Sequence, residues 1–160
     1  MSFVIEQADP KDCDAMLALF PRLASFDLPN DRNPEHLWSG DAEMLREWAR
    51  GGNSNCIVHV AKRPDGSIVG VTMVTLGPEL LSHAPSAHLE AIAVSEKAEG
   101  KGVGKALLVA AEAGARERGA LSMSLHVFAT NARARSIYEH AGYDEELIRC
   151  IKPFTNDALS

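Results

Sequence analysis

Several features that would assign this chain to a membrane, to nucleic acid or to an oxidising compartment are missing from its sequence. Its three cysteines, Cys13, Cys56 and Cys150, are widely spaced and form no CxxC pair, which favours reduced cytosolic thiols over disulfides or a metal site. Lys and Arg number 16 against 22 Asp and Glu, so a nucleic-acid partner is not expected. No apolar run approaches the roughly 18 residues of a membrane helix, and no basic leader opens the chain. We therefore expect a cytoplasmic protein that binds no metal, nucleic acid or membrane.

What the chain does contain is the composition of a folded globular domain. Apolar residues make up 46% and charged residues 24%, close to the averages for such proteins. A chain of 160 residues buries about 70% of the surface that it exposes when unfolded, which is enough for one core. No repeat or low-complexity linker divides the sequence. We expect one domain that spans residues 1–160.

Strand and helix patterns are interleaved along most of the chain. Apolar periodicity and turn residues predict strands at 3–8, 55–62, 67–76, 87–94, 121–128 and 146–154. Capping residues and a period of 3.6 predict helices at about 10–25, 39–50, 102–118 and 131–140. The second and third strands are joined by a hairpin turn.

The stretch at 90–108 combines a buried strand, a glycine-rich turn and the start of a helix. Its turn at 99–104 reads EGKGVG, and the helix follows from about Lys105. Such a turn gathers unpaired backbone N–H groups at the positive end of a helix dipole, where an anion such as a pyrophosphate fits. A P-loop is excluded because Glu99 and Ala106 stand where it needs Gly and then Ser or Thr. The G-x-G-x-G spacing also differs from the dinucleotide fingerprint.

Two motifs in this order resemble the GNAT superfamily of N-acetyltransferases. The turn resembles that family's acyl-CoA pyrophosphate loop, which reads Arg or Gln, two variable residues, Gly, one variable residue and then Gly or Ala. Gly102 and Gly104 match this pattern, whereas Glu99 departs from it. The segment at 131–143 resembles the family's N-x-x-A-x-x-x-Y-x-x-x-G-[FY] segment, with matches at Asn131, Ala134, Tyr138, Gly142 and Tyr143.

The resemblance implies a fold, a cosubstrate and a set of binding residues. The fold is the α/β (α+β) GNAT fold, a mixed and mostly antiparallel central sheet that splays between strands 4 and 5 and is flanked by about four helices. The cosubstrate is acetyl-CoA, with its pantetheine against the backbone of the fourth strand and its pyrophosphate on the glycine turn. The implied cofactor-binding residues are Ile92, Ala93, Val94, Glu99, Gly100, Lys101, Gly102, Val103, Gly104, Lys105, Asn131, Ala134 and Tyr138.

Three residues are candidates for catalysis. The second motif implies that Tyr138 lies near the thioester sulfur, where a phenol with an ordinary pKa of about 10 could protonate the departing thiolate; the alternative is an aromatic residue that packs the last helix on the sheet. His88 and Glu90 are two apart on a strand and so share one face. Either could accept a proton from an ammonium substrate, and Glu90 could instead only attract a cation. The strand around them resembles that of arylalkylamine acetyltransferases, which carry two histidines at this spacing.

Other polar residues have weaker cases. The loop at 26–40 lies where this family shapes its acceptor pocket, and its acids Asp27, Asp31 and Glu35 either are solvated or select a cationic amine. Either Arg133 or Arg135 meets the nucleotide phosphate, or both are solvated helix residues. His126 follows on the next strand without a motif to support it.

The sequence therefore predicts an acetyl-CoA-dependent N-acetyltransferase that moves an acetyl group to the primary amine of a small molecule by direct attack. One alternative is a non-catalytic acyl-CoA-binding or sensor domain of the same fold. Another is a protein or peptide N-acetyltransferase. Strand pairing near the chain end leaves a homodimer conceivable.

Overall fold

The computed structural model describes residues 1–29, 32–155 and 158–159. In these residues the strands are β1 (Val4–Gln7), β2 (Cys56–Lys62), β3 (Ile68–Pro78), β4 (Pro85–Val94) and β5 (Met123–Leu125). The α-helices are α1 (Cys13–Leu17), α2 (Ser39–Ala49), α3 (Val103–Glu117) and α4 (Ala132–His140). Short 3-10 helices are η1 (Pro10–Asp12), η2 (Phe20–Ala24), η3 (Pro34–Leu37) and η4 (Glu96–Ala98).

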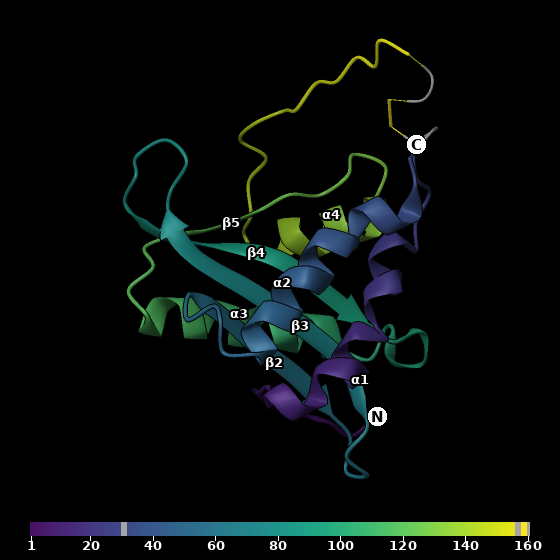
Figure 1. The fold of residues 1–160 in the computed structure, drawn as a ribbon, viewed down its shortest axis with the longest axis vertical. Coiled ribbons are helices and arrows are strands. Elements are labelled where there is room, and N and C mark those ends of the chain that lie inside the picture. The colour runs from purple at the N-terminus through teal and green to yellow at the C-terminus, as the bar shows by residue number, and fades with distance from the viewer. Residues whose placement is uncertain (30–31, 156–157, 160) are drawn as a thin grey trace.

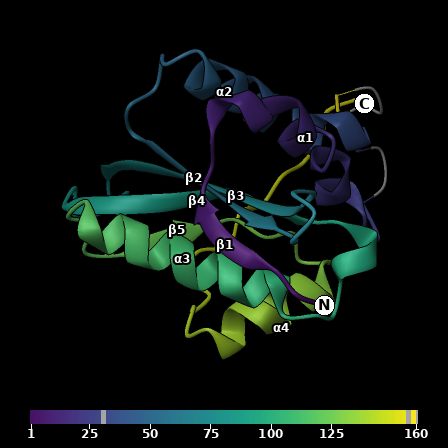
Figure 2. The same ribbon diagram turned by 90° about the horizontal axis from the view of Figure 1, so that it is seen from below.

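The sheet runs in the order β1-β2-β3-β4-β5, with antiparallel pairing up to β4 and parallel pairing of β4 with β5. Figure 1 shows the sheet with its helices, and Figure 2 shows α1 and α2 on one face and α3 and α4 on the other. The first face buries Met16, Phe20 and Leu45 against Val71 and Met73. The second face buries apolar side chains of α3, among them Leu108, Ala111 and Ala115. The predicted mixed, mostly antiparallel α/β fold is confirmed.

A β-bulge in β4 divides that strand into two parts. Met73 pairs with Ala91 and Val74 with Leu89, so Glu90 is the extra residue. In a regular strand, residues two apart lie on the same face of the sheet. Across the bulge they do not, because Leu89 packs in the cluster with α3 whereas Ala91 packs in the cluster with α1 and α2. Pairing with β5 also stops at Leu89. The two strands thus separate beyond this point, as the splayed sheet predicts.

Three predicted elements differ in the structure. The helix at 10–25 is broken into η1, α1 and η2, since Pro21 in η2 has no N–H to continue the ladder. The strand at 121–128 shortens to β5 because its partner β4 pairs with it only up to Leu89. The strand predicted at 146–154 is wrong.

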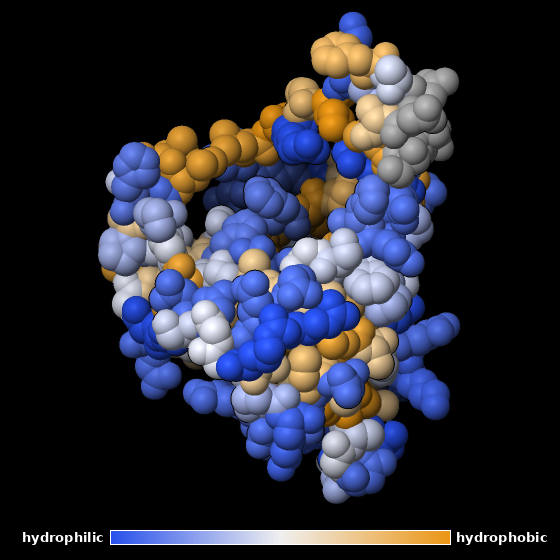
Figure 3. Space-filling view, viewed as in Figure 1, coloured by the Kyte–Doolittle hydropathy of each residue, from blue (hydrophilic) through white to orange (hydrophobic). Residues whose placement is uncertain are grey.

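Residues 146–154 contain no strand, although their apolar residues suit one. A strand needs a neighbour for its backbone hydrogen bonds, and this segment pairs with no strand among the described residues. It runs as an extended trace away from the sheet (Figure 1), and the surface is hollowed between it and the body of the molecule (Figure 3). Ile148 and Phe154 are 90% and 92% exposed.

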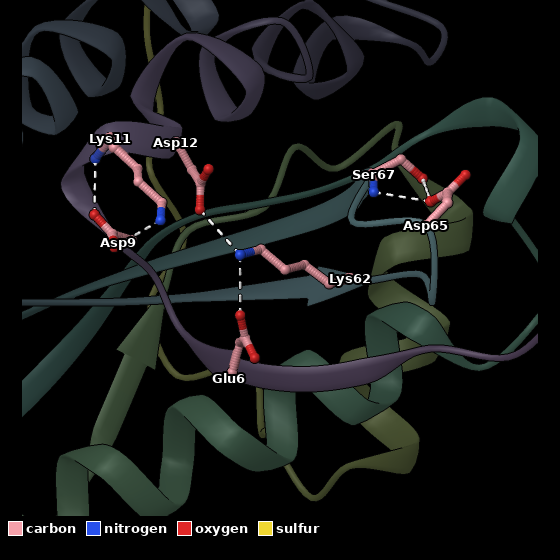
Figure 4. A network of polar contacts seen from close by, with 7 residues as sticks. All are labelled: Glu6, Asp9, Lys11, Asp12, Lys62, Asp65 and Ser67. Atoms are coloured by element: carbon pink, nitrogen blue, oxygen red, sulfur yellow. Dashed lines mark hydrogen bonds and ion pairs between the residues drawn. The ribbon is translucent and has the colours of Figure 1, made fainter.

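An ion-pair network fastens the far edge of the sheet. Lys62 Nζ lies 3.0 Å from Glu6 Oε1 and 3.1 Å from Asp12 Oδ2, which ties β2 to β1 and to η1 (Figure 4). Both carboxylates raise the pKa of Lys62.

Within the described part of the chain, no helix has the length and apolar character needed to cross a membrane.

Candidate active site

The splayed region of the sheet opens into a cavity of about 500 Å³. Its wall is made by the second half of β4, the glycine loop (residues 99–105), the segment after β5, helix α4, and parts of η2, η3 and α2. Of the residues predicted from sequence, those in the wall are Glu90, Ile92, Ala93, Val94, Glu99, Gly100, Gly102, Val103, Gly104, Lys105, Asn131, Ala134 and Tyr138. His88 and Lys101 are not in the wall.

The glycine loop lines this cavity except at Lys101, and its backbone N–H groups after Glu99 lack partners within the described chain. No acceptor among the described residues contacts the amides of residues 100–105, and α3 begins at Val103. Gly100 and Gly102 have φ values of 71° and 84°, which favour glycine. Gly104 has no such constraint, and a Cβ added there meets only Val94 Cγ2 at 3.7 Å. The loop therefore fits an anion at the N-terminus of a 15-residue helix.

Glu99 is held between two arginines at the rim of the loop. Its Oε1 accepts from Arg22 Nη2 at 2.5 Å, and its Oε2 lies 3.1 Å from Arg133 Nη1. Arg22 also donates from Nε to the carbonyl of Val94 at 3.1 Å. The carboxylate in this position is thus compensated by two positive charges from η2 and α4.

The backbone of β4 forms a second wall beside the loop. Residues 89–94 all line the cavity, and β5 pairs with none of them beyond Leu89. The opposite wall comes from residues 125–128 and Asn131, whose side chain caps α4 by accepting from the amide of Ala134 at 3.3 Å. The cavity is therefore a slot between strands that have separated.

Tyr138 on α4 lines this slot and is mostly buried. Burial raises the pKa of its phenol to about 12. Its ring packs edge-to-face against Tyr143, with centroids 6.1 Å apart, and Tyr143 Oη donates to Glu112 Oε2 on α3 at 2.7 Å. The second motif thus anchors α4 on α3 and fixes the ring of Tyr138.

Glu90 lies in the same wall with a second carboxylate, Asp41. The bulge brings Glu90 Oε1 to 2.7 Å from the hydroxyl of Thr75, which donates to it. Asp41 stands in the first turn of α2, where burial and then the charge of Glu90 raise its pKa to about 7. Burial, and then Glu90, also raises the pKa of the Cys56 thiol to about 11. The slot therefore contains a pair of interacting carboxyl groups.

His88 points to the neighbouring strand. Its Nδ1 lies 2.8 Å from Ser124 Oγ on β5, and its ring is 4.8 Å from that of His126. Burial lowers the pKa of His88, Glu90 raises it, and His126 lowers it further. His126, rather than His88, is in the wall of the cavity.

Sequence reasoning missed several residues of this site. Asp31 lies outside the described residues, and neither Asp27 nor Glu35 lines the cavity. Asp41 lines the cavity instead, although in the sequence its position indicated only the start of a helix. Arg22 carried no motif at all. Phe26 and Phe128, whose rings are 5.4 Å apart, close the wall between η2 and the end of β5.

The sequence match to known proteins decides the family. The acetyltransferase (GNAT) family matches residues 17–143, the part of the chain that carries the cavity. The chain belongs to the GNAT family of acetyltransferases. The membership indicated by the two motifs is confirmed.

Among the described residues no group of three His, Cys, Asp or Glu side chains is arranged to hold a metal ion.

Other GNAT-like proteins resemble this chain to different extents. The uncharacterised N-acetyltransferase YycN of Bacillus subtilis is 46% identical over 50 residues, which are 31% of this chain and 32% of YycN. A Pyrococcus furiosus protein assigned as an acetyl transferase superposes with a TM-score of 0.76 at 23% identity, over 96% of this chain and all of that one. The aminoglycoside 6′-N-acetyltransferase of Acinetobacter baumannii superposes with a TM-score of 0.72 at 15% identity, over 96% and 99% of the two chains. The two structures show a shared fold, which does not determine the acceptor.

Proposed function

We propose that this GNAT protein transfers an acetyl group from acetyl-CoA to the primary amine of a small cationic molecule by direct attack of the amine. The observation that carries the proposal is a single cavity that joins the glycine loop and the open backbone of β4 to Glu90, Asp41 and Tyr138. Groups suited to a polyanionic donor and groups suited to a cationic acceptor thus share one wall. No cysteine is among the described lining residues, which favours direct attack over a covalent acyl-enzyme.

The donor side fits the phosphates and pantetheine of acetyl-CoA, the acyl donor of this family. The open amides of the glycine loop and the side chain of Lys105 suit phosphate oxygens. The edge of β4 at Ile92 to Val94 is not paired with β5 and offers backbone groups for an extended amide-containing chain, apart from the Val94 carbonyl, which accepts from Arg22. When bound, acetyl-CoA supplies the activated acetyl thioester.

The acceptor side fits an ammonium group that must lose its proton. An alkyl amine with a pKa of about 10 is almost entirely protonated at neutral pH and cannot attack in that form. Glu90, oriented by Thr75, and Asp41 both stand in the cavity and attract the cation. Because the pKa of Asp41 is raised to about 7, this carboxyl group can exchange a proton near neutral pH. Either carboxyl group can therefore act as the base.

Tyr138 supplies the opposite proton transfer. A phenol with a pKa of about 12 keeps its proton throughout the physiological range. In this protonated form it can donate the proton to the thiolate as the thiolate leaves, and the tyrosinate that remains then takes a proton from water. Because the ring of Tyr138 packs against Tyr143, its hydroxyl group has a defined position from which to donate the proton.

A small acceptor is favoured over a peptide by the wall on the acceptor side. Phe26, Leu37 and Asp41 come from segments before and in α2, and their side chains add to the wall of the cavity. A long peptide needs an open groove through this wall. Turnover compared between small amines and peptides tests this point, and faster turnover of peptides than of any small amine would contradict it.

Thiol release from acetyl-CoA, measured over a panel of polyamines, aminoglycosides, arylalkylamines, amino acids and peptides, tests the activity itself. We expect release that depends on both the protein and an amine. A burst of thiol before amine addition would contradict direct attack. If Glu90 is the base, Glu90→Gln depresses the rate and alters its dependence on pH, whereas an unchanged profile leaves Glu90 only the role of attracting the cation.

A further inference from the structure

Three charged residues from distant parts of the chain meet at one side of the glycine loop. Arg22 comes from η2, Glu99 from the loop itself and Arg133 from the first turn of α4. Each oxygen of Glu99 contacts a different guanidinium group, at 2.5 Å and 3.1 Å. All three residues line the cavity. We name this set the arginine bridge.

Most of the donor capacity of the arginine bridge is still open. A guanidinium group has five N–H donors. Arg22 uses Nε on the carbonyl of Val94 and Nη2 on Glu99, and Arg133 uses Nη1 on Glu99. The remaining donors have no acceptor among the described residues. Both guanidinium groups contact Glu99, which directly precedes the open amides of residues 100–105, and both line the same cavity.

The two arginines differ in how firmly they are held. The side chain of Arg22 is 25% exposed and has two partners on two elements. The side chain of Arg133 is 58% exposed and has Glu99 as its carboxylate partner. A long, exposed arginine has many rotamers, and an ion pair selects among them. Glu99 thus restricts Arg133 to the side of the loop.

Charge supports a polyanionic ligand at this point. The arginine bridge has a net charge of +1, and Lys101 and Lys105 add two positive charges in the same loop. Arginine forks match phosphate oxygens in two-point hydrogen bonds. We propose that Arg22 and Arg133 bind the phosphate groups of the cofactor, and that Glu99 is a positioning residue that holds both guanidinium groups at the glycine loop. This inference rests on the proposed binding of acetyl-CoA.

Calorimetric titration with acetyl-CoA tests the two arginines. Arg22→Gln and Arg133→Gln should each weaken binding about tenfold at low salt, the loss of one charge-assisted contact. Each should also flatten the rise of Kd between 50 mM and 300 mM NaCl, because fewer charge contacts remain to be screened. Arg63→Gln in the exposed turn between β2 and β3 is the matched control for loss of one charge, and it should leave both quantities unchanged.

Unchanged affinity in both variants would overturn the proposal. So would weaker binding with the salt dependence of the wild type, since that is the result of a purely structural role. Arg133 is exposed, so we expect Arg133→Gln to fold even if Arg22→Gln does not, and the proposal can then be tested with Arg133→Gln alone. Failure of the wild type to bind acetyl-CoA would instead refute the proposed function itself.

A double-mutant cycle tests the positioning role of Glu99. Gln at this position keeps the shape, but its one amide oxygen cannot hold two guanidinium groups as ionised Glu99 does. Arg133→Gln should therefore cost at least threefold less affinity for acetyl-CoA in the Glu99→Gln background than in the wild type, about 0.6 kcal/mol of coupling. An equal cost in both backgrounds would show that Glu99 does not position Arg133.

Discussion

Replacing Asp41 by Asn should stabilise the free protein at neutral and alkaline pH. Burial and then Glu90 raise the pKa of Asp41 from 3.8 to about 7 in the folded protein. Between these two pH values the folded protein keeps a proton that the unfolded chain has lost, so the free energy of unfolding falls as pH rises. Above pH 7 the folded protein bears the full cost of the ionised carboxylate. Asn never ionises and avoids this cost.

The size of the effect follows from the same shift. A shift of about three units corresponds to roughly 4 kcal/mol at full burial, and partial exposure of Asp41 reduces this to roughly 1–2 kcal/mol. For a chain of 160 residues that difference raises Tm by about 2–8 °C. Thermal unfolding without ligands between pH 4 and pH 9 should show the gain of Asp41→Asn over the wild type growing up to pH 7 and then levelling.

The control for Asp41 lies on the same helix. Glu47→Gln removes an exposed carboxyl group of α2 and reports any general effect of charge on stability. In Glu90→Gln the second cause of the shift is gone, so Asp41→Asn should stabilise that variant less. A difference between Asp41→Asn and the wild type that stays constant from pH 4 to pH 9 would refute the reasoning about Asp41.

Substitutions at three further positions test separate parts of the account. Tyr138→Phe should lower turnover with little change in the Kd for acetyl-CoA, and unchanged turnover would remove Tyr138 from the mechanism. Gly104→Asp should abolish acetyl-CoA binding through added charge, while Gly104→Ala, whose Cβ has room, should retain it; tight binding by a folded Asp variant would contradict the loop assignment. Gly70→Ala places a Cβ 2.7 Å from Leu107 Cδ1 and 2.9 Å from Val103 Cγ1. Tm should therefore fall by an amount equivalent to about 1–3 kcal/mol. An unchanged Tm would show that the side chains of α3 move aside without cost.

The sequence predicted those parts of the fold and site that depend on local pattern. The glycine loop could be read from its letters, because Gly100 and Gly102 adopt the positive φ values that the turn requires. The cap at Asn131 and the helix that follows it are local in the same way. Strand alternation likewise located the hairpin of β2 and β3, whose pairing needs only neighbouring residues.

The missed features depend on contacts between distant residues. Nothing in the letters around Glu90 marks it as the extra residue of a bulge, since the register is set by β3. Arg22 and Glu99 are 77 positions apart and meet only after η2 folds over the end of β4. Asp41 could not be assigned to the cavity because the residues around it in sequence do not reveal that α2 brings it near Glu90 of β4. The segment at 146–154 has the residues of a strand but no partner strand in the described chain, which its own sequence does not reveal.

Thiol release from acetyl-CoA in the presence and absence of each amine of the panel tests the central claim most directly. The account predicts that at least one small cationic amine produces release well above the rate with buffer alone, and that Tyr138→Phe lowers this rate. Thermal stabilisation of the protein by acetyl-CoA, with no release for any amine or peptide, would contradict the claim and identify a domain that binds acyl-CoA without transferring its acetyl group.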